Sequence, residues 1–140
     1  MKYFIFVLSF FLLTTCSKRD SNNNCNYLLN LAVNYPVNMN LPQFSQLQYT
    51  GTSIYIAGPG NGGIIITNVG NAWRAWDASD PNHTPSSCST LTIDGANAVC
   101  GCADGYTYSL FIGQPTTALP CGLKEYRVDV TGSNTLLISN

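Results

Sequence analysis

Residues 91–115 read LTIDGANAVCGCADGYTYSLFIGQP, and this stretch decides the fold class. Two short runs, 91–93 and 97–100, flank a turn at Asp94-Gly95-Ala96, and an aromatic run over 106–112 ends at Gly113-Gln114-Pro115. Short runs of β-branched and aromatic residues bounded by Gly, Pro and Asp are typical of strands joined by tight turns. The stretch therefore predicts three consecutive strands.

The rest of the chain after Cys25 repeats this pattern, and no stretch of ten or more residues keeps a helical period. A first extended stretch over 29–39 contains Pro36, which suits an edge strand because proline donates no ladder hydrogen bond. The other predicted strands are 53–57, 63–68, 72–77 and a final hairpin of 124–130 with 135–139 across 131–134. Strands at this spacing predict an all-β fold, an antiparallel sandwich or small barrel.

The N-terminus has the features of an exported lipoprotein. Lys2 is followed by an apolar run over 3–13, which fits a signal-peptide core and is shorter than the ~20 residues that span a bilayer. Leu13-Thr14-Thr15-Cys16 resembles a lipobox, although Thr stands where Gly, Ala or Ser is usual before the cysteine. We predict that residues 1–15 are a cleaved signal peptide and that Cys16 is lipidated. An ordinary secretory signal with a coincidental cysteine is the alternative.

Residues 16–24 read CSKRDSNNN and contain no apolar residue after the cysteine. Such a segment cannot bury surface, so we predict a lipidated flexible tether followed by one domain over 25–140. The expected partner is a membrane, reached through the lipid, in the cell envelope, with the outer membrane preferred to the inner. Any protein or glycan partner is left open.

Composition argues against nucleic acid as a partner. The chain has a net charge of −1, which becomes −2 when Lys2 leaves with the signal peptide, and it has no basic run. Charged residues are 9% of the chain, so amides and hydroxyls must supply most of the polar surface.

The cysteine count is odd once Cys16 is lipidated, because five of the six cysteines remain. An exported location favours disulfides. Cys100 and Cys102 are unlikely partners for each other, because next-but-one residues in a strand rarely have disulfide geometry. One of the two should pair elsewhere, and Cys88 is the nearest candidate.

The order of these features resembles a Rieske domain. A first loop spans Trp76-Asp77-Ala78-Ser79-Asp80-Pro81-Asn82-His83 and reaches Cys88, and a second reads Cys100-Gly101-Cys102-Ala103-Asp104-Gly105. An aromatic strand, a Gly-x-Pro turn and two closing strands follow. Residues 41–140 are similar to a group of Rieske-like lipoproteins from Bacteroidota. The resemblance implies an all-β Rieske-like sandwich or small barrel with two cluster-type loops, and it implies electron transfer through a 2Fe–2S cluster held by two Cys and two His.

The ligand positions of the family are only partly kept here. Asp80 stands at the first-loop cysteine ligand and Ala103 at the second-loop histidine, whereas Cys100 matches the second-loop cysteine ligand. His83 follows position 80 by three residues instead of two. A carboxylate is a poor substitute for a thiolate, so Asp80, His83 and Cys100 form a degenerate set. We expect no cofactor, unless this altered set still binds a 2Fe–2S cluster.

The resemblance also implies one disulfide, because Cys88 and Cys102 match the pair that joins the two loops. The remaining Cys25 and Cys121 could then tie the N-terminal segment to the chain before Lys124. Cys100 is then left without a partner.

Three hypotheses about function follow. The first is a non-enzymatic envelope lipoprotein, the second a Rieske 2Fe–2S electron-transfer protein, and the third a glycan-binding surface lipoprotein that uses Trp73 or Trp76. A zinc site of His83, Cys88, Cys100 and Cys102 has suitable ligand types but is disfavoured where disulfides form. We expect no enzymatic activity beyond an electron-transfer component.

Overall fold

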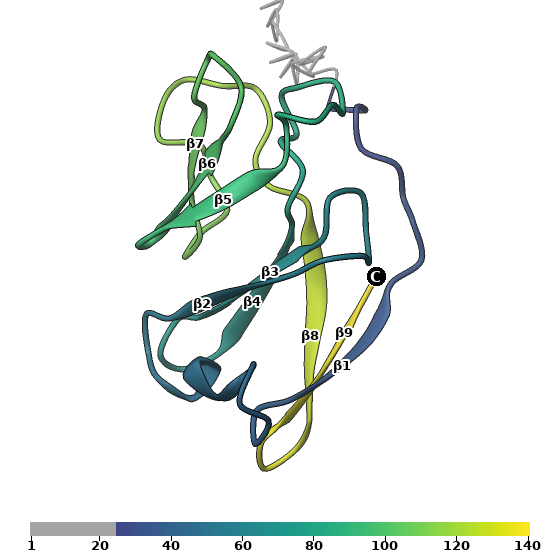
Figure 1. The fold of residues 1–140 in the computed structure, drawn as a ribbon, viewed down its shortest axis with the longest axis vertical. Coiled ribbons are helices and arrows are strands. Elements are labelled where there is room, and N and C mark those ends of the chain that lie inside the picture. The colour runs from purple at the N-terminus through teal and green to yellow at the C-terminus, as the bar shows by residue number, and fades with distance from the viewer. Residues whose placement is uncertain (1–24) are drawn as a thin grey trace, which may run out of the picture.

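The computed structural model describes residues 25–140, so the predictions for the signal peptide, Cys16 and the tether lie outside the described residues. This part of the chain forms nine strands and one short 3₁₀-helix (Figure 1). In chain order they are β1 (Asn34–Asn38), η1 (Ser45–Gln48), β2 (Ser53–Ile56), β3 (Ile64–Asn68), β4 (Trp73–Asp77), β5 (Leu91–Asp94), β6 (Asn97–Cys100), β7 (Thr107–Ser109), β8 (Glu125–Gly132) and β9 (Thr135–Ser139).

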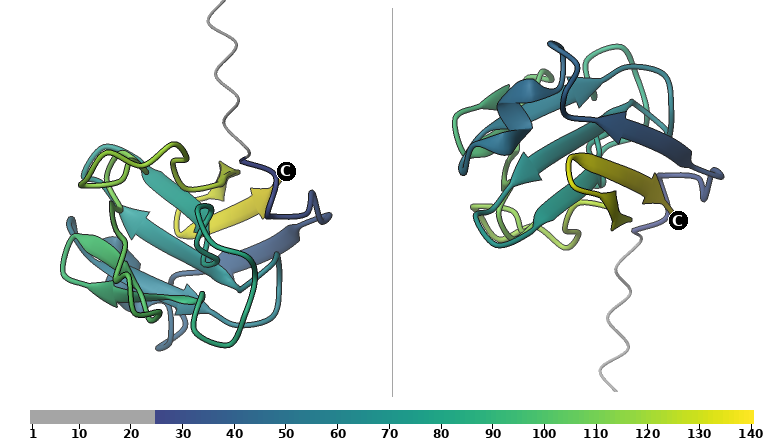
Figure 2. Two further views of the ribbon diagram at one scale, coloured as in Figure 1. Left: turned by 90° about the horizontal axis from the view of Figure 1, so that it is seen from above. Right: turned by 90° about the horizontal axis from the view of Figure 1, so that it is seen from below.

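The strands form two antiparallel sheets. The larger sheet has the order β1-β9-β8-β4-β3-β2 and the smaller one the order β5-β6-β7. The larger sheet curls, and β5–β7 lie at one end of it (Figures 1 and 2). The all-β expectation is therefore confirmed. Within the described residues, no helix is long and apolar enough to cross a membrane.

The run Ile64-Ile65-Ile66 explains why the domain has two cores. Ile64 and Ile66 pack in a core enclosed by the larger sheet and η1, whereas Ile65 packs in a second core with the smaller sheet. Side chains alternate across a strand, so a strand covered on both faces needs apolar residues at every position. This continuous run places β3 between the two cores.

The neighbouring strand β4 follows the same alternation. Trp73 and Ala75 pack with the first core, and Trp76 is 2% exposed in the second. The two tryptophans, three residues apart in one strand, therefore lie on opposite faces of β4.

The predicted strands agree closely with the observed ones, with four differences. The first predicted stretch, 29–39, is a strand only over Asn34–Asn38, because side-chain hydrogen bonds hold residues 29–31 outside both sheets. The aromatic run ends as a strand at Ser109, where the chain turns and Gly113 N–H donates to the Ser109 carbonyl. β8 extends to Gly132 across an irregularity after Val130, so the final turn is shorter than 131–134. The helix η1 was not predicted because four residues carry no periodic signal. Pro36 lies in β1 at the sheet edge, as expected.

Candidate functional site

The two cysteine loops lie next to each other at one end of the domain. The first connects β4 to β5 and the second connects β6 to β7. A disulfide joins Cys88 of the first loop to Cys102 of the second, with Cα atoms 4.8 Å apart. A second disulfide joins Cys25 to Cys121. The first is the pair that the resemblance implies, and the second joins the two remaining cysteines as expected. The first disulfide withdraws Cys88 and Cys102 from the zinc site that the sequence left open.

Asp80 is a buried carboxylate at the base of the first loop, with an exposure of 0%. Its backbone N–H donates to the Ser89 carbonyl at 2.9 Å, which holds the two sides of the loop together. The Tyr108 hydroxyl and the Asn82 backbone N–H both donate to Oδ1 of Asp80. Oδ2 of Asp80 is buried and has no hydrogen-bond partner among the described residues.

Asn82 ties this carboxylate to the second disulfide. Its side-chain amide donates to the Tyr108 hydroxyl and to the Cys121 carbonyl, both at 2.8 Å, and its Oδ1 accepts the Cys121 N–H at 3.1 Å. Sequence reasoning missed Asn82 and Tyr108. The Asp-Pro-Asn triplet was an available signal for Asn82, because Asp side chains often accept the N–H two residues on.

Cys100 is a free thiol, 3% exposed, at the end of β6. Its Sγ donates weakly to the Cys88 carbonyl at 3.8 Å, and its backbone N–H donates to the Tyr106 carbonyl. Burial, partly offset by the Cys102 backbone N–H and reinforced by the nearby Asp80 carboxylate, raises the pKa of Cys100 to about 11. The thiol is therefore protonated at neutral pH, which makes it a weak nucleophile.

His83 turns toward a different carboxylate. Its Nε2 lies 3.6 Å from Asp104 Oδ2, between side chains that are 31% and 28% exposed, and Nδ1 lies 3.0 Å from the Thr84 carbonyl. This pair bridges the tips of the two loops. Ala103, next to Asp104, contributes no donor atom.

A second buried carboxylate, Asp77, serves the scaffold. It accepts hydrogen bonds from the Tyr126 hydroxyl, the Asn61 side chain and the backbone N–H groups of Asn61, Gly62 and Ser79. Burial, strengthened by the negative charge of Asp77, raises the pKa of Tyr126 above its usual value. Most of these donors lie in or beside the 58–62 turn and β8, so Asp77 is a structural residue.

Comparison with solved structures identifies the fold. The chain is similar to a chain from the complex of reduced oxygenase and oxidised ferredoxin in carbazole 1,9a-dioxygenase, with a TM-score of 0.51 and 19% identity over 76% of this chain and 93% of that chain. The fold is Rieske-like. Two further similar structures have TM-scores of 0.46 and 0.44. One is a putative NADH-dependent nitrite reductase small subunit from Mycobacterium tuberculosis (13% identity, 79% and 97% covered), and the other is the ferredoxin of carbazole 1,9a-dioxygenase from Nocardioides aromaticivorans IC177 (19%, 74% and 95%). No family model matches the sequence, and no curated protein matches it.

The donor atoms of this Rieske-like domain do not fit a 2Fe–2S cluster. Such a cluster takes four protein ligands, two of them histidines in a Rieske centre. Here Asp80 and Cys100 lie together, His83 pairs with Asp104, and Ala103 offers no ligand. Across the described residues, no group of three or more His, Cys, Asp or Glu side chains is arranged to hold a metal ion.

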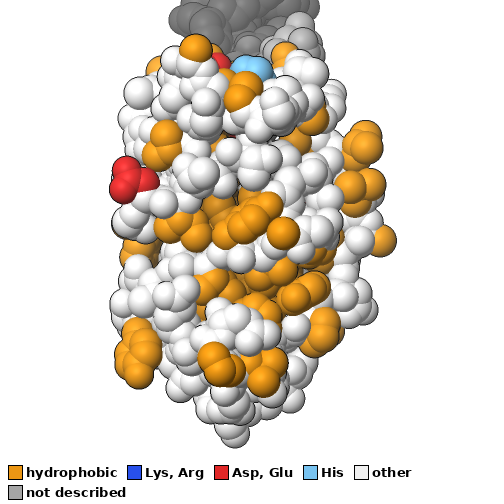
Figure 3. Space-filling view, in the orientation of Figure 1, with side chains coloured by type: hydrophobic (Ala, Val, Ile, Leu, Met, Phe, Trp, Pro, Cys, Tyr) orange, Lys and Arg blue, Asp and Glu red, His pale blue; other side chains and the backbone are white. Residues whose placement is uncertain are grey.

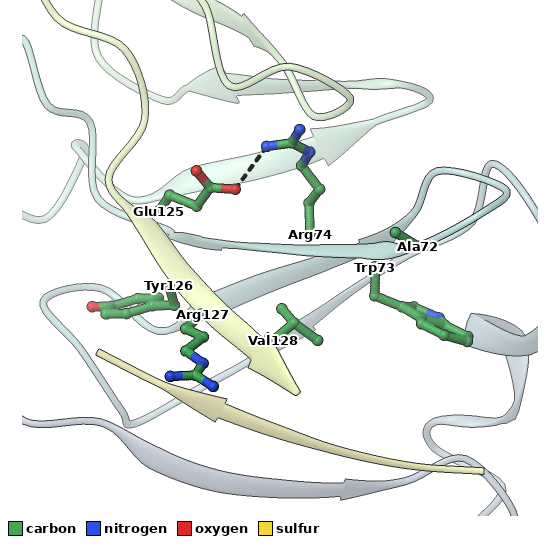
Figure 4. A pocket seen from close by; sticks show the side chains of 7 residues that line it. All are labelled: Ala72, Trp73, Arg74, Glu125, Tyr126, Arg127 and Val128. Carbon is green, nitrogen blue, oxygen red and sulfur yellow. Dashed lines mark hydrogen bonds and ion pairs between the residues drawn. The ribbon is translucent and has the colours of Figure 1, made fainter. Parts of the chain in front are cut away.

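A groove of about 530 Å³ lies elsewhere on the Rieske-like domain, where β4 and β8 separate after two residue pairs (Figure 4). Arg74 and Glu125 face each other across it at 2.7 Å, and Trp73 points to the opposite side of β4 (Figure 4). Trp73 donates its ring N–H to the Leu47 carbonyl, and Trp76 donates to the Leu110 carbonyl. Trp76 is buried, and Trp73 is partly buried at the side of the groove.

Proposed function

We propose that this protein is a lipid-anchored envelope protein whose Rieske-like domain holds no cluster and acts as a non-enzymatic binding or structural module. The observation that supports this most directly is the arrangement of Asp80. The sequence resemblance matches Asp80 to a cluster ligand, and here its carboxylate accepts hydrogen bonds from Tyr108 and Asn82. This supports a first loop that is held by hydrogen bonds and not by iron.

The proposal also explains why the fold persists without a metal. The two loops are joined covalently by the Cys88–Cys102 disulfide, and the Asp80–Asn82–Cys121 chain of hydrogen bonds ties the first loop to the second disulfide. Cross-links and buried, paired polar groups replace the constraint that metal bonds supply in a metalloprotein. The anchor rests on Cys16 and the lipobox-like residues before it.

The test is direct measurement of iron. The mature chain carrying Cys16→Ser is purified, and iron, acid-labile sulfide and visible absorbance are measured before and after anaerobic reconstitution. We expect a colourless protein with sub-stoichiometric iron. The matched control is Asp80→Cys/Ala103→His, which restores both missing ligand types and should gain iron relative to the parent.

The second candidate is electron transfer through an altered cluster. The free Oδ2 of Asp80 beside the Cys100 thiol is the observation in its favour. One 2Fe–2S cluster per unmodified chain, stable to desalting, would establish this candidate and overturn the first.

A further inference from the structure

The segment before β1 carries a row of exposed apolar side chains. Tyr27, Leu29 and Leu31 alternate along residues 25–32 and are 44%, 64% and 39% exposed. The segment belongs to neither sheet. It runs along the right-hand edge of the domain in Figure 1, and orange side chains project along that edge in Figure 3. We call Tyr27, Leu29 and Leu31 the N-terminal ridge.

The ridge is held firmly in place although it lies outside the sheets. The Asn61 side chain both accepts the Leu29 N–H at 2.9 Å and donates to the Leu29 carbonyl at 3.0 Å. Asn61 is itself held by the buried Asp77. The Asn140 side chain donates to the Leu31 carbonyl. These contacts fix the backbone so that the apolar side chains remain on the surface.

Further contacts hold both ends of the segment. The Cys25–Cys121 disulfide fixes its start, and the Val33 N–H donates to Asn140 Oδ1 at 2.9 Å at its end. Between them, Lys124 Nζ donates to Asn30 Oδ1 at 3.2 Å. A segment that is bound at so many points and still exposes leucines indicates a surface that receives a partner.

We propose that the N-terminal ridge lies on the lipid bilayer that holds the acylated Cys16, an inference that rests on the lipid anchor of the proposed function. Nine residues lead from Cys16 to Cys25, and they reach at most ~30 Å when fully extended. The ridge begins two residues after Cys25. An anchored chain therefore keeps the ridge within reach of the membrane surface.

The chemistry of the ridge also fits a bilayer surface. Residues 25–32 carry no charge, and tyrosine and leucine are favourable at the boundary between headgroups and acyl chains. Both backbone polar groups of Leu29 already have protein partners, so their removal from water leaves neither unpaired. Lys18 and Arg19 precede the ridge and attract anionic headgroups.

The experiment places a tryptophan on the ridge and, in a second variant, another on the opposite end of the domain. The full acylated chain is reconstituted in phosphatidylethanolamine–phosphatidylglycerol vesicles that contain brominated acyl chains. Tyr27→Trp reports on the ridge. Tyr49→Trp is the matched control, because Tyr49 is 70% exposed and follows η1, which lies at the far end of the domain from Cys25 in Figure 1. The emission of Trp73 and Trp76, measured in the parent, is subtracted.

We expect brominated chains to quench the introduced tryptophan of Tyr27→Trp by roughly half and to leave that of Tyr49→Trp unchanged, since an interfacial side chain reaches the acyl boundary. Adding Leu29→Ser/Leu31→Ser to Tyr27→Trp should abolish most of that quenching. This double substitution keeps the hydrogen bonds of Asn61 and Asn140, because both bind main-chain atoms.

Equal quenching of the Tyr27→Trp and Tyr49→Trp variants in an acylated protein would overturn the inference. So would an oligomer in detergent that protects the ridge tryptophan from acrylamide, because the ridge would then receive a second copy of the chain. Mass spectrometry of Cys16 distinguishes a failure of the proposed lipid anchor from a failure of the ridge proposal. An unmodified Cys16 removes the anchor of the proposed function, whereas an acylated Tyr27→Trp chain without quenching overturns the ridge alone.

Discussion

Removal of the Cys88–Cys102 disulfide tests how far the cross-link between the two loops stabilises the domain. The cysteines are 14 residues apart, and a closed loop of this length contributes about 3 kcal/mol in the chain-entropy model. We expect Cys88→Ala/Cys102→Ala to lower the free energy of unfolding by this amount. For a domain of this size the melting temperature should fall by roughly 10 °C. The double substitution leaves no thiol in either loop that could pair with Cys100.

Urea unfolding at pH 7 without reductant measures the effect, on a mature chain that carries Cys16→Ser. Two comparisons calibrate it. Cys25→Ala/Cys121→Ala opens a loop with a separation of 96 residues and should cost more, about 4.7 kcal/mol from the loop alone. Cys100→Ala should cost about 1 kcal/mol, for the loss of one buried sulfur.

Two results would refute this reasoning. The first is a Cys88→Ala/Cys102→Ala protein within about 1 kcal/mol of its parent, which would mean that the bridge adds little beyond the native contacts. The second is a Cys88–Cys100 peptide in a non-reduced digest. The alignment of the second loop with the Rieske pattern would then be wrong by two residues. Ala103 would no longer match the position of the family's second-loop histidine ligand.

Three further predictions concern the anchor, the free thiol and the scaffold carboxylate. Cys16→Ser should abolish acylation and release the protein from membranes, so retention after a carbonate wash would place the anchor elsewhere. The pKa of Cys100 is raised to about 11 by burial, so its contribution to stability is complete below pH 9 and is lost between pH 9 and 11; thermal melts across that range should fall more steeply for the parent than for Cys100→Ala. Asp77→Ala leaves the Tyr126 hydroxyl and several N–H groups without an acceptor and should cost about 3–5 kcal/mol in urea unfolding. Glu125→Gln, which breaks an exposed ion pair, should cost less than about 1 kcal/mol, and similar losses for the two variants would contradict the role given to Asp77.

Most of the strands were predictable because their signals are local. Alternation, turn residues and Pro36 act within a few positions of the chain, and the observed strands follow them closely. The short helix η1 and the early end of β7 were not predictable in this way. The four residues of η1 carry no periodic signal, and its Leu47 carbonyl accepts the Trp73 ring N–H from a distant strand. β7 ends early because the chain turns back after Ser109, where Tyr108 forms a bridge with Pro115.

The candidate site likewise has some features that the sequence alone predicts and others that depend on tertiary contacts. The sequence alone established that position 103 offers no ligand, because the alanine side chain has no donor atom in any conformation. The Rieske-like order of the cysteines also implied that Cys88 pairs with Cys102 and that Cys100 has no partner. The sequence could not show that Tyr108 donates to Asp80, or that His83 turns to Asp104, because those partners are distant in the sequence and meet only in the folded domain. The N-terminal ridge has the same origin. The sequence predicted one extended stretch over 29–39, and only the fold, through Asn61 and Asn140, holds Leu29 and Leu31 outside the sheets and on the surface.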